Sequence, residues 1–434
     1  MVKLRPHQQE VVNFSGGRMG VAAVPGSGKT QTLSYLAARL IAEGKVTEDQ
    51  EVLIVTLVNS AVDNFTKRVK GFVQEAGLLP GLGYRVRTLH GLANDIVRER
   101  PSVVGVSSQF AILDEPESNQ IMRTVAVSWL KNHPEVIQAY ARDEGAFSAS
   151  SQRYWEDLAV NLGQAIIRQA KDLQLGPSDL RQRLGDAGLE DLLLNAGCEF
   201  YADYQKALDY RGALDFDDLI RLALRVLEVD PDLLQALRMR WPYILEDEAQ
   251  DSSRLQEDIL RLLAGESGGW VRVGDPNQAI YETFTTASPE YLLRFLGEPG
   301  VASRALPNSG RSARRIIHLA NTLVDWSRQT PVLHPALNTA LWHAHIEPTP
   351  KGDPQPNPPD REKNVILHIE ALKPERELAL LAQSAKRFVE EHPDETCAIL
   401  APSNTRGAAI YAQLQKQAVP ALEPLRPTQA TPAP

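Results

Sequence analysis

The chain has 434 residues, of which 43% are hydrophobic and 23% charged, and its formal net charge is −9. This composition is typical of a globular protein with about two to four domains. No apolar run approaches the roughly 18 residues of a membrane-spanning helix, and the N-terminus lacks a signal-peptide pattern, so we expect a cytoplasmic protein. The acidic balance does not favour nucleic-acid binding, but a local basic groove would decide that question. Cys198 and Cys397 are expected to be reduced core residues.

A glycine-rich segment at residues 23–30 reads Ala-Val-Pro-Gly-Ser-Gly-Lys-Thr. Gly26 and Gly28 allow a tight turn whose amides point inward and bind an anion together with the next helix N-terminus. Lys29 would reach the β- and γ-phosphates of a nucleotide, and the Thr30 hydroxyl would bind Mg²⁺. The predicted nucleotide-binding residues of this segment are Ala23, Pro25, Gly26, Ser27, Gly28, Lys29, Thr30 and Gln31.

The pattern around this segment supports the interpretation. Residues 20–24 are small and β-branched, as in a buried strand, and residues 32–40 have helical spacing. Strand, loop and helix in this order are the setting that a phosphate-binding loop requires. A glycine-rich turn before an ordinary helix is the alternative.

An apolar strand that ends in acids forms the second motif, Tyr-Ile-Leu-Glu-Asp-Glu-Ala-Gln-Asp at residues 243–251. Asp247 is the predicted Mg²⁺ ligand, through water, because Mg²⁺ gives up its water reluctantly. Glu248 would position and deprotonate the attacking water. An acidic cluster alone is usually a solvated loop, but the paired phosphate-binding loop favours an ATP-hydrolysing site.

Changes of pattern along the chain predict the domains. Alternating strands and helices over 1–98 and again over 205–296 indicate one α/β domain with a parallel sheet. Residues 99–204 read as a helical insertion, residues 297–419 as a partial second α/β domain, and residues 420–434 as a Pro-rich disordered tail. The later predicted elements are a helix over 314–323, strands over 365–369 and 396–400, and a helix over 375–389.

Several short motifs in order resemble the UvrD/Rep group of superfamily 1 DNA helicases over about residues 4–420. The segments that carry the resemblance are 4–10, 56–61, 88–91, 214–219, 273–281 and 308–312, in addition to the two motifs above. The resemblance implies a RecA-like P-loop NTPase domain with a helical insertion and the start of a second RecA-like domain. It also implies ATP and Mg²⁺ as cofactors.

The resemblance assigns further roles. Gln8 would read the adenine edge, Gln278 would sense the γ-phosphate, and Arg311 would neutralise charge in the transition state. The implied catalytic set is Lys29, Asp247, Glu248, Gln278 and Arg311, with Thr30 and Asp247 as metal ligands. Single-stranded DNA would be held by polar donors and by aromatic platforms, for which the candidates are Thr56, Asn59, His90, Tyr281 and Phe284.

The expected function is an ATP-dependent DNA helicase or translocase, with 3′ to 5′ movement suggested by the family, acting on single-stranded DNA and duplex junctions. Two alternatives stay open: the helicase subunit of a helicase–nuclease complex, and a non-catalytic regulator that binds nucleotide and DNA.

Two departures from the family pattern bear on this expectation. Ser309-Gly310 stands where the family commonly has a tyrosine that stacks on adenine. The last two family motifs are not in these 434 residues. We expect a C-terminal region or a second chain to supply them, and we expect the chain alone to bind ATP better than it turns it over.

Overall fold

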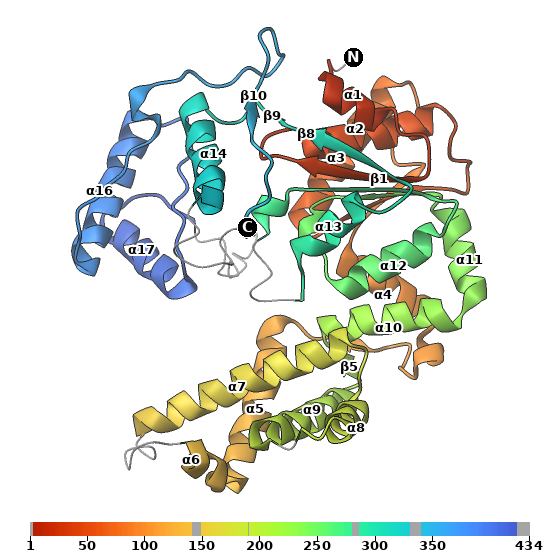
Figure 1. The fold of residues 1–434 in the computed structure, drawn as a ribbon, viewed down its shortest axis with the longest axis vertical. Coiled ribbons are helices and arrows are strands. Elements are labelled where there is room, and N and C mark those ends of the chain that lie inside the picture. The colour runs from red at the N-terminus through yellow and green to blue at the C-terminus, as the bar shows by residue number, and fades with distance from the viewer. Residues whose placement is uncertain (1–2, 141–148, 190, 280–285, 330–339, 423–434) are drawn as a thin grey trace, which may run out of the picture. The chain divides into compact units, whose positions relative to one another are not determined.

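The computed structural model describes residues 3–140, 149–189, 191–279, 286–329 and 340–422 (Figure 1). The chain divides into two compact units, Met1–Asn364 and Val365–Pro434. The predicted tail falls almost wholly on residues 423–434, which lie outside the described residues.

A six-stranded parallel sheet is the centre of the first unit, with the order β3-β2-β6-β7-β1-β8. Because every pairing is parallel, the carboxyl ends of all six strands meet at one edge of the sheet, where open α/β folds bind their ligands. The strands are β1 (Arg18–Ala23), β2 (Val52–Thr56), β3 (Tyr84–Thr88), β6 (Tyr243–Glu246), β7 (Gly269–Gly274) and β8 (Val301–Leu306).

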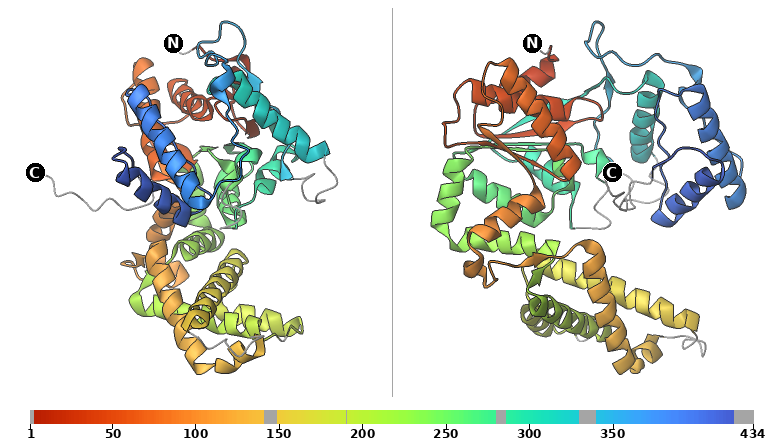
Figure 2. Two further views of the ribbon diagram at one scale, coloured as in Figure 1. Left: turned by 90° about the vertical axis from the view of Figure 1, so that its left-hand side faces the viewer. Right: turned by 180° about the vertical axis from the view of Figure 1, so that it is seen from behind.

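Helices cover both faces of this sheet, as the two views in Figure 2 show. In β2 the side chains alternate: Val52 and Ile54 belong to one core, and Leu53 and Val55 belong to the other. The first core also takes α1 (Pro6–Val12), α2 (Lys29–Ala42) and α3 (Asn59–Glu75), and the second takes α4 (Leu89–Glu99), α10 (Phe216–Val229), α11 (Pro231–Arg240) and α12 (Arg254–Ala264). A strand buried on both faces explains the unbroken apolar run in the sequence.

The helical insertion has a core of its own, which includes Met122, Trp129, Phe200 and Tyr201. The short strands β4 (Ala111–Ile112) and β5 (Ala213–Leu214) pair in parallel where the chain leaves and re-enters the sheet domain. Between them lie α5 (Glu115–Asn132), α6 (Pro134–Tyr140), α7 (Ala149–Asp172), α8 (Pro177–Asp186) and α9 (Leu192–Arg211).

The sequence-based boundary after residue 296 needs one correction, because the next strand completes the first sheet. Strand β8 pairs in parallel with β1 over six residue pairs, from Arg18–Val301 to Ala23–Leu306. It follows α13 (Pro289–Leu296), whose Phe295 packs in the core below the sheet. Composition does not report which sheet a strand joins, since main-chain pairing decides that. The division between the compact units comes later, after Asn364.

Beyond β8 the chain forms β9 (Asn308–Ser309), α14 (Arg314–Gln329) and β10 (Glu347–Pro348), with β9 and β10 paired. The helix prediction over 314–323 is therefore confirmed, although α14 is longer.

The second unit contains α16 (Pro374–Glu391) and α17 (Asn404–Lys416), which pack through Ala382, Ala385, Ile410 and Leu414. The strands predicted over 365–369 and 396–400 are wrong: neither segment is a strand. A strand needs a neighbour that bonds its main chain, and the described part of this unit offers none. Most apolar side chains of these segments stay exposed, as Leu400 shows at 93%, although Ile399 packs against the small core of this unit.

Cys198 is buried as expected, whereas Cys397 is exposed, because it lies in one of these unpaired segments. Among the described residues, no helix is both long enough and apolar enough to cross a membrane.

Candidate nucleotide-binding site

The loop after β1 has the backbone of an anion cradle. Gly26 and Gly28 have φ angles of +75° and +86°, in the left-handed region that L side chains rarely adopt. A Cβ on Gly26 would also lie 2.5 Å from the Cβ of Arg311. Gly28 is the N-cap of α2, so the unpaired amides of a 14-residue helix open toward the loop.

Lys29 and Glu248 meet at this loop, although 219 positions separate them in the chain. The Lys29 Nζ lies 2.6 Å from the Glu248 Oε2, and the Lys29 side chain is 11% exposed. Glu248 has φ 55° and ψ 41°, a left-handed conformation that costs a non-glycine residue on the order of 1–3 kcal/mol. Strain of this kind is kept where the surrounding structure requires it, and here it accompanies a carboxylate bonded to the loop lysine.

Asp247 lies beside this pair, and the charge of Lys29 offsets only part of the cost of its burial. Its side chain is buried, and its Oδ1 has no hydrogen-bond partner among the described residues. Burial, followed by the charge of Glu248, raises the pKa of the Asp247 carboxyl to about 7. The chemistry fits a divalent cation, since carboxylate and hydroxyl oxygens are the ligands Mg²⁺ prefers and Thr30 follows Lys29 in the first turn of α2. No group of three or more His, Cys, Asp or Glu side chains in the described part of the chain could hold a metal alone, so the phosphates of a nucleotide would complete the coordination.

Gln250 is a site residue that the sequence analysis missed. Its side-chain amide donates to Glu248 Oε2 at 3.0 Å and to Asp251 Oδ2 at 2.9 Å, and its Oε1 accepts from the Asp275 backbone amide at 3.0 Å. It therefore joins the carboxyl ends of β6 and β7 and fixes the Glu248 carboxylate. The signal in the sequence that could have identified Gln250 is its position inside the acidic motif at residues 243–251.

The N-terminal segment lies against the same loop. Gln8 is buried; its Nε2 donates to the Ser27 carbonyl at 2.9 Å and its Oε1 accepts from the Arg5 amide at 2.9 Å. Arg5 donates through Nε and Nη2 to Asp353, at 2.7 and 3.1 Å, and through Nη1 to the carbonyl of Asn308. This arginine was also missed, and no local motif signals its partner 348 positions away.

The segment after β8 closes over the loop. The Gly310 amide donates to the Gly26 carbonyl at 3.3 Å, which brings the neighbouring Arg311 to the cradle. A Cβ on Gly310 would lie 2.5 Å from the carbonyl oxygen of Gln355 and 2.9 Å from an Arg5 nitrogen. The space that a tyrosine side chain would need at position 310 is thus occupied by protein.

The end of β7 contributes Asp275 and the short helix η4 (Pro276–Gln278). Burial raises the pKa of Asp275, and its Oδ1 accepts from the Asn277 amide at 3.0 Å. The Asn277 side chain forms two hydrogen bonds with the main chain of Trp342, at 2.9 and 2.6 Å. Gln278, the predicted phosphate sensor, is partly buried at the end of η4.

The candidate DNA residues are only partly brought together. Thr56 ends β2 opposite Thr88 of β3 but is 1% exposed, so its side chain is not available to a ligand, because β2 lies inside the sheet. Asn59 is exposed at the start of α3. The ring of His90 lies edge-on to that of Phe216 at 5.0 Å, and burial lowers the pKa of His90. Tyr281 and Phe284 lie outside the described residues.

A parallel sheet with a glycine-rich loop after β1 and acids after β6 defines a P-loop nucleotide-binding fold, which confirms the predicted RecA-like α/β class. Residues 4–299 match the family model described as "UvrD/REP helicase N-terminal domain", and the chain belongs to this family.

Curated relatives agree with this assignment. DNA helicase II of Salmonella typhimurium is 30% identical over 323 residues, covering 74% of this chain and 40% of that protein. ATP-dependent DNA helicase PcrA of Bacillus subtilis is 29% identical over 323 residues, covering 74% and 39%. DNA helicase II of Haemophilus influenzae is 27% identical over 321 residues, covering 74% and 40%. The matched part of the chain therefore covers about two fifths of the length of these relatives.

Proposed function

We propose that this chain binds ATP with Mg²⁺ and couples its hydrolysis to movement on single-stranded DNA, as a 3′ to 5′ helicase or translocase. One observation carries the proposal. The loop after β1 and the strained end of β6 bring Lys29 and Glu248 within 2.6 Å, beside the Oδ1 of Asp247, which has no partner in the part of the chain that the structure describes. Phosphate binding, metal binding and a base thus lie at one edge of the sheet.

Each residue has a distinct part in the proposed reaction. The loop amides and Lys29 bind the β- and γ-phosphates, so Lys29 exchanges its contact with Glu248 for phosphate oxygens. Thr30 and Asp247 would hold Mg²⁺, which neutralises charge on the phosphate oxygens when bound. Glu248, kept in place by Gln250, then accepts the proton of the attacking water. Arg311 approaches from the segment after β8 to stabilise the transition state, and Gln278 senses the γ-phosphate.

We further propose that nucleic acid lies along the carboxyl ends of β2 and β3. Asn59 and His90 would contact its backbone, and Phe216 is an additional candidate for base stacking, because it is 40% exposed beside His90. The proposal includes duplex junctions as substrates, and it includes a second chain or a further segment that supplies more catalytic groups. It also includes the domain division, in which residues 99–204 form an insertion and the first motor domain extends to include β8.

Two substitutions test the proposal. Lys29→Ala should abolish binding of a fluorescent ATP analogue, because the phosphates lose the cation of the loop. Glu248→Gln should keep nucleotide affinity within a few-fold and lower DNA-stimulated hydrolysis by about 10²-fold or more. Glu75→Gln, an exposed acid at the end of α3, is the matched control.

The outcomes separate the candidate functions. Wild-type turnover in the Glu248→Gln protein would contradict the base assignment. Nucleotide and DNA binding by the unmodified chain without any DNA-stimulated hydrolysis would instead support a non-catalytic regulator.

A further inference from the structure

Two neighbouring residues at the end of α7 connect the helical insertion to two helices of the sheet domain. Lys171 contacts the start of α10, and Asp172 contacts the start of α12. The first of these helices begins at Phe216, the candidate for base stacking, and the second follows the short segment that begins at Glu248. The end of α7 therefore lies between the proposed nucleic-acid contact and the proposed catalytic base.

The contact with α10 is a buried ion cluster. The Lys171 Nζ lies 2.6 Å from the Asp215 Oδ2 and 2.9 Å from the Asp218 Oδ2, and the Lys171 side chain is 0% exposed. The Tyr204 hydroxyl donates to the same Asp215 oxygen at 2.9 Å, and the Asp215 Oδ1 caps α10 by accepting from the Asp218 amide at 2.8 Å. Charged hydrogen bonds are strong in a buried, low-dielectric setting. The first turn of α10 is therefore fixed to the end of α7.

This cluster fixes the position of Phe216. Phe216 is the first residue of α10 and follows the capping Asp215 directly. Its ring lies edge-on to the His90 ring, with the two centroids 5.0 Å apart, and it is 40% exposed. A base that stacks on Phe216 would therefore contact a residue whose backbone is fixed by Lys171.

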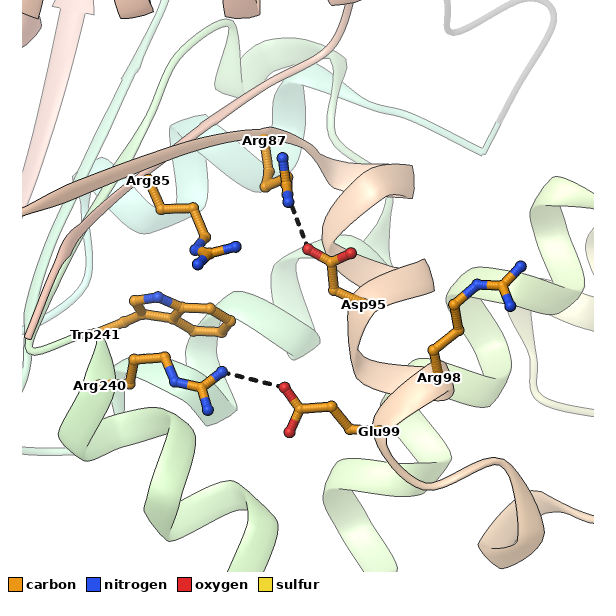
Figure 3. Close-up of a pocket in the computed structure, with 7 residues that line it drawn as sticks. All are labelled: Arg85, Arg87, Asp95, Arg98, Glu99, Arg240 and Trp241. Atoms are coloured by element: carbon orange, nitrogen blue, oxygen red, sulfur yellow. Dashed lines mark hydrogen bonds and ion pairs between the residues drawn. The ribbon is translucent and has the colours of Figure 1, made fainter. Parts of the chain in front are cut away.

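His90, the neighbour of Phe216, is attached to the sheet domain from another side. It lies in the first turn of α4. Arg87 of β3 donates to Asp95 of α4 at 2.8 Å, and Arg240 at the end of α11 donates to Glu99 of α4 at 3.1 Å, as the dashed lines in Figure 3 show. The insertion therefore sets the start of α10, whereas ion pairs within the sheet domain attach α4.

The contact with α12 is partly exposed. Arg254, the first residue of α12, donates through its Nη2 to the Asp172 carbonyl, and its Nε lies 3.7 Å from the Asp172 Oδ2. The side chains of Arg254 and Asp172 are 36% and 13% exposed. Ion pairs at such positions contribute little to stability. A substitution here should therefore disturb the connection without unfolding the protein.

A short bonded segment leads from Arg254 back to Glu248. The Ser252 hydroxyl donates to the Glu246 Oε1 at 2.7 Å, and the Gln250 amide donates to the Glu248 Oε2 at 3.0 Å. The left-handed backbone of Glu248 persists only because the surrounding structure requires it. A displacement at the start of α12 should therefore change the position of the Glu248 carboxylate.

We propose that the end of α7 transmits the occupancy of the nucleic-acid site to Glu248. Lys171, Asp172 and Arg254 are then positioning residues that couple the two sites. The inference rests on the proposed function, and it adds the connection between nucleic-acid binding and the nucleotide site. Coupling between binding sites is reciprocal, so bound nucleic acid and bound nucleotide should change each other's affinity by the same factor.

The test measures this coupling factor. It is the ratio of the dissociation constants of a labelled oligothymidine without and with a saturating non-hydrolysable ATP analogue and Mg²⁺, obtained by fluorescence anisotropy. In Arg254→Gln, which removes the ion pair with Asp172, we expect the factor to move toward one by about three- to tenfold. Affinity for the analogue in the absence of DNA should stay unchanged. Some coupling should remain, because α10 and α12 also share a core.

Asp258→Asn is the matched control for this variant. It removes the other ion pair of Arg254, at 3.4 Å, and leaves the contact with Asp172 in place. The coupling factor of the Asp258→Asn protein should equal that of the unmodified chain.

Tyr204→Phe tests the contact with α10 independently. It removes one hydrogen bond to Asp215 but keeps the ion pair with Lys171, and a melting curve checks that the protein is folded. Tyr201→Phe is its control, because Tyr201 is a buried tyrosine of the same helix whose hydroxyl donates to the Leu175 carbonyl at 2.9 Å. We expect Tyr204→Phe, but not Tyr201→Phe, to move the coupling factor toward one by at least about twofold.

Unchanged coupling factors in both Arg254→Gln and Tyr204→Phe would overturn the inference and leave the proposed function standing. A coupling factor of one in an unmodified chain that binds both ligands would overturn it as well. If Arg254→Gln weakened nucleotide binding equally with and without DNA, Arg254 would be a structural support of the acidic segment and not a coupling residue. No DNA binding by the unmodified chain, with nucleotide binding retained, would refute the DNA part of the proposed function and the inference with it.

Discussion

Two residues at the carboxyl edge of the sheet, where we propose that the nucleotide binds, have energetically unfavourable conformations or surroundings. Glu248 has a left-handed backbone, and Asp247 is a buried carboxyl without a hydrogen-bond partner for its Oδ1 among the described residues. Each is a local cost that makes sense if the folded protein must present these carboxylates to a ligand. Asp251 and Gln250 complete a polar group around them.

The pKa of Asp247 makes this cost measurable. The folded-state pKa, about 7, lies above the ordinary value of 3.8, so the folded protein binds the proton more tightly than the unfolded chain. In metal-free protein this group therefore lowers stability as pH rises from about 4 to 7. We predict that Asp247→Asn raises the melting temperature in EDTA at pH 8 and has a smaller effect at pH 5, while Mg²⁺-dependent nucleotide binding is lost.

Asp186→Asn, at an exposed position in the helical insertion, is the control for this experiment. A melting temperature that falls at pH 8 in the Asp247→Asn protein would show that the Asp247 carboxylate stabilises the fold, contrary to the argument.

At the scale of elements, one buried ion cluster joins the helical insertion to the sheet domain. Lys171 of α7 is fully buried, and its Nζ lies 2.6 Å from Asp215 and 2.9 Å from Asp218 of α10 and its N-cap. Burial disfavours the charged amine, but the charges of Asp218 and Asp215 outweigh it and raise the pKa of Lys171. The Tyr204 hydroxyl of α9 donates to Asp215 at 2.9 Å. Three helices thus meet at one cluster.

Removal of the cation should be costly. Lys171→Met leaves two buried carboxylates without their partner, a change that typically costs on the order of 3–5 kcal/mol. We predict a loss of that size in urea unfolding. Lys206→Met, an exposed lysine on α9, should change stability by less than about 0.5 kcal/mol. Adding Asp218→Asn to Lys171→Met should recover part of the loss of stability. A Lys171→Met protein with unchanged stability would mean that water reaches the cluster.

At the scale of the whole molecule, the described contacts place the candidate site in the unit Met1–Asn364. The described residues of the second unit form a small core between α16 and α17. We predict that residues 1–364 expressed alone fold and bind the ATP analogue with the affinity of the 434-residue chain, as measured by fluorescence titration. A tenfold weaker affinity in a folded fragment would mean that the second unit contributes to the site.

The sequence by itself predicted the local structure at the carboxyl edge of the sheet, where we propose that the nucleotide binds. The spacing of Gly26, Gly28 and Lys29, the apolar strand before Asp247, and the alternation of strands and helices are local patterns, because neighbouring residues are enough to specify a tight turn, a helix start or a buried strand. The family assignment came from the same local motifs.

Tertiary structure alone decided the features that depend on pairing between distant segments. The addition of β8 to the first sheet, the contact of Arg5 with Asp353 and the ion cluster at Lys171 all join residues far apart in the chain. The same reason explains the failed strands over 365–369 and 396–400: a β-propensity is local, but the hydrogen bonds that make a strand come from a partner that local sequence does not name.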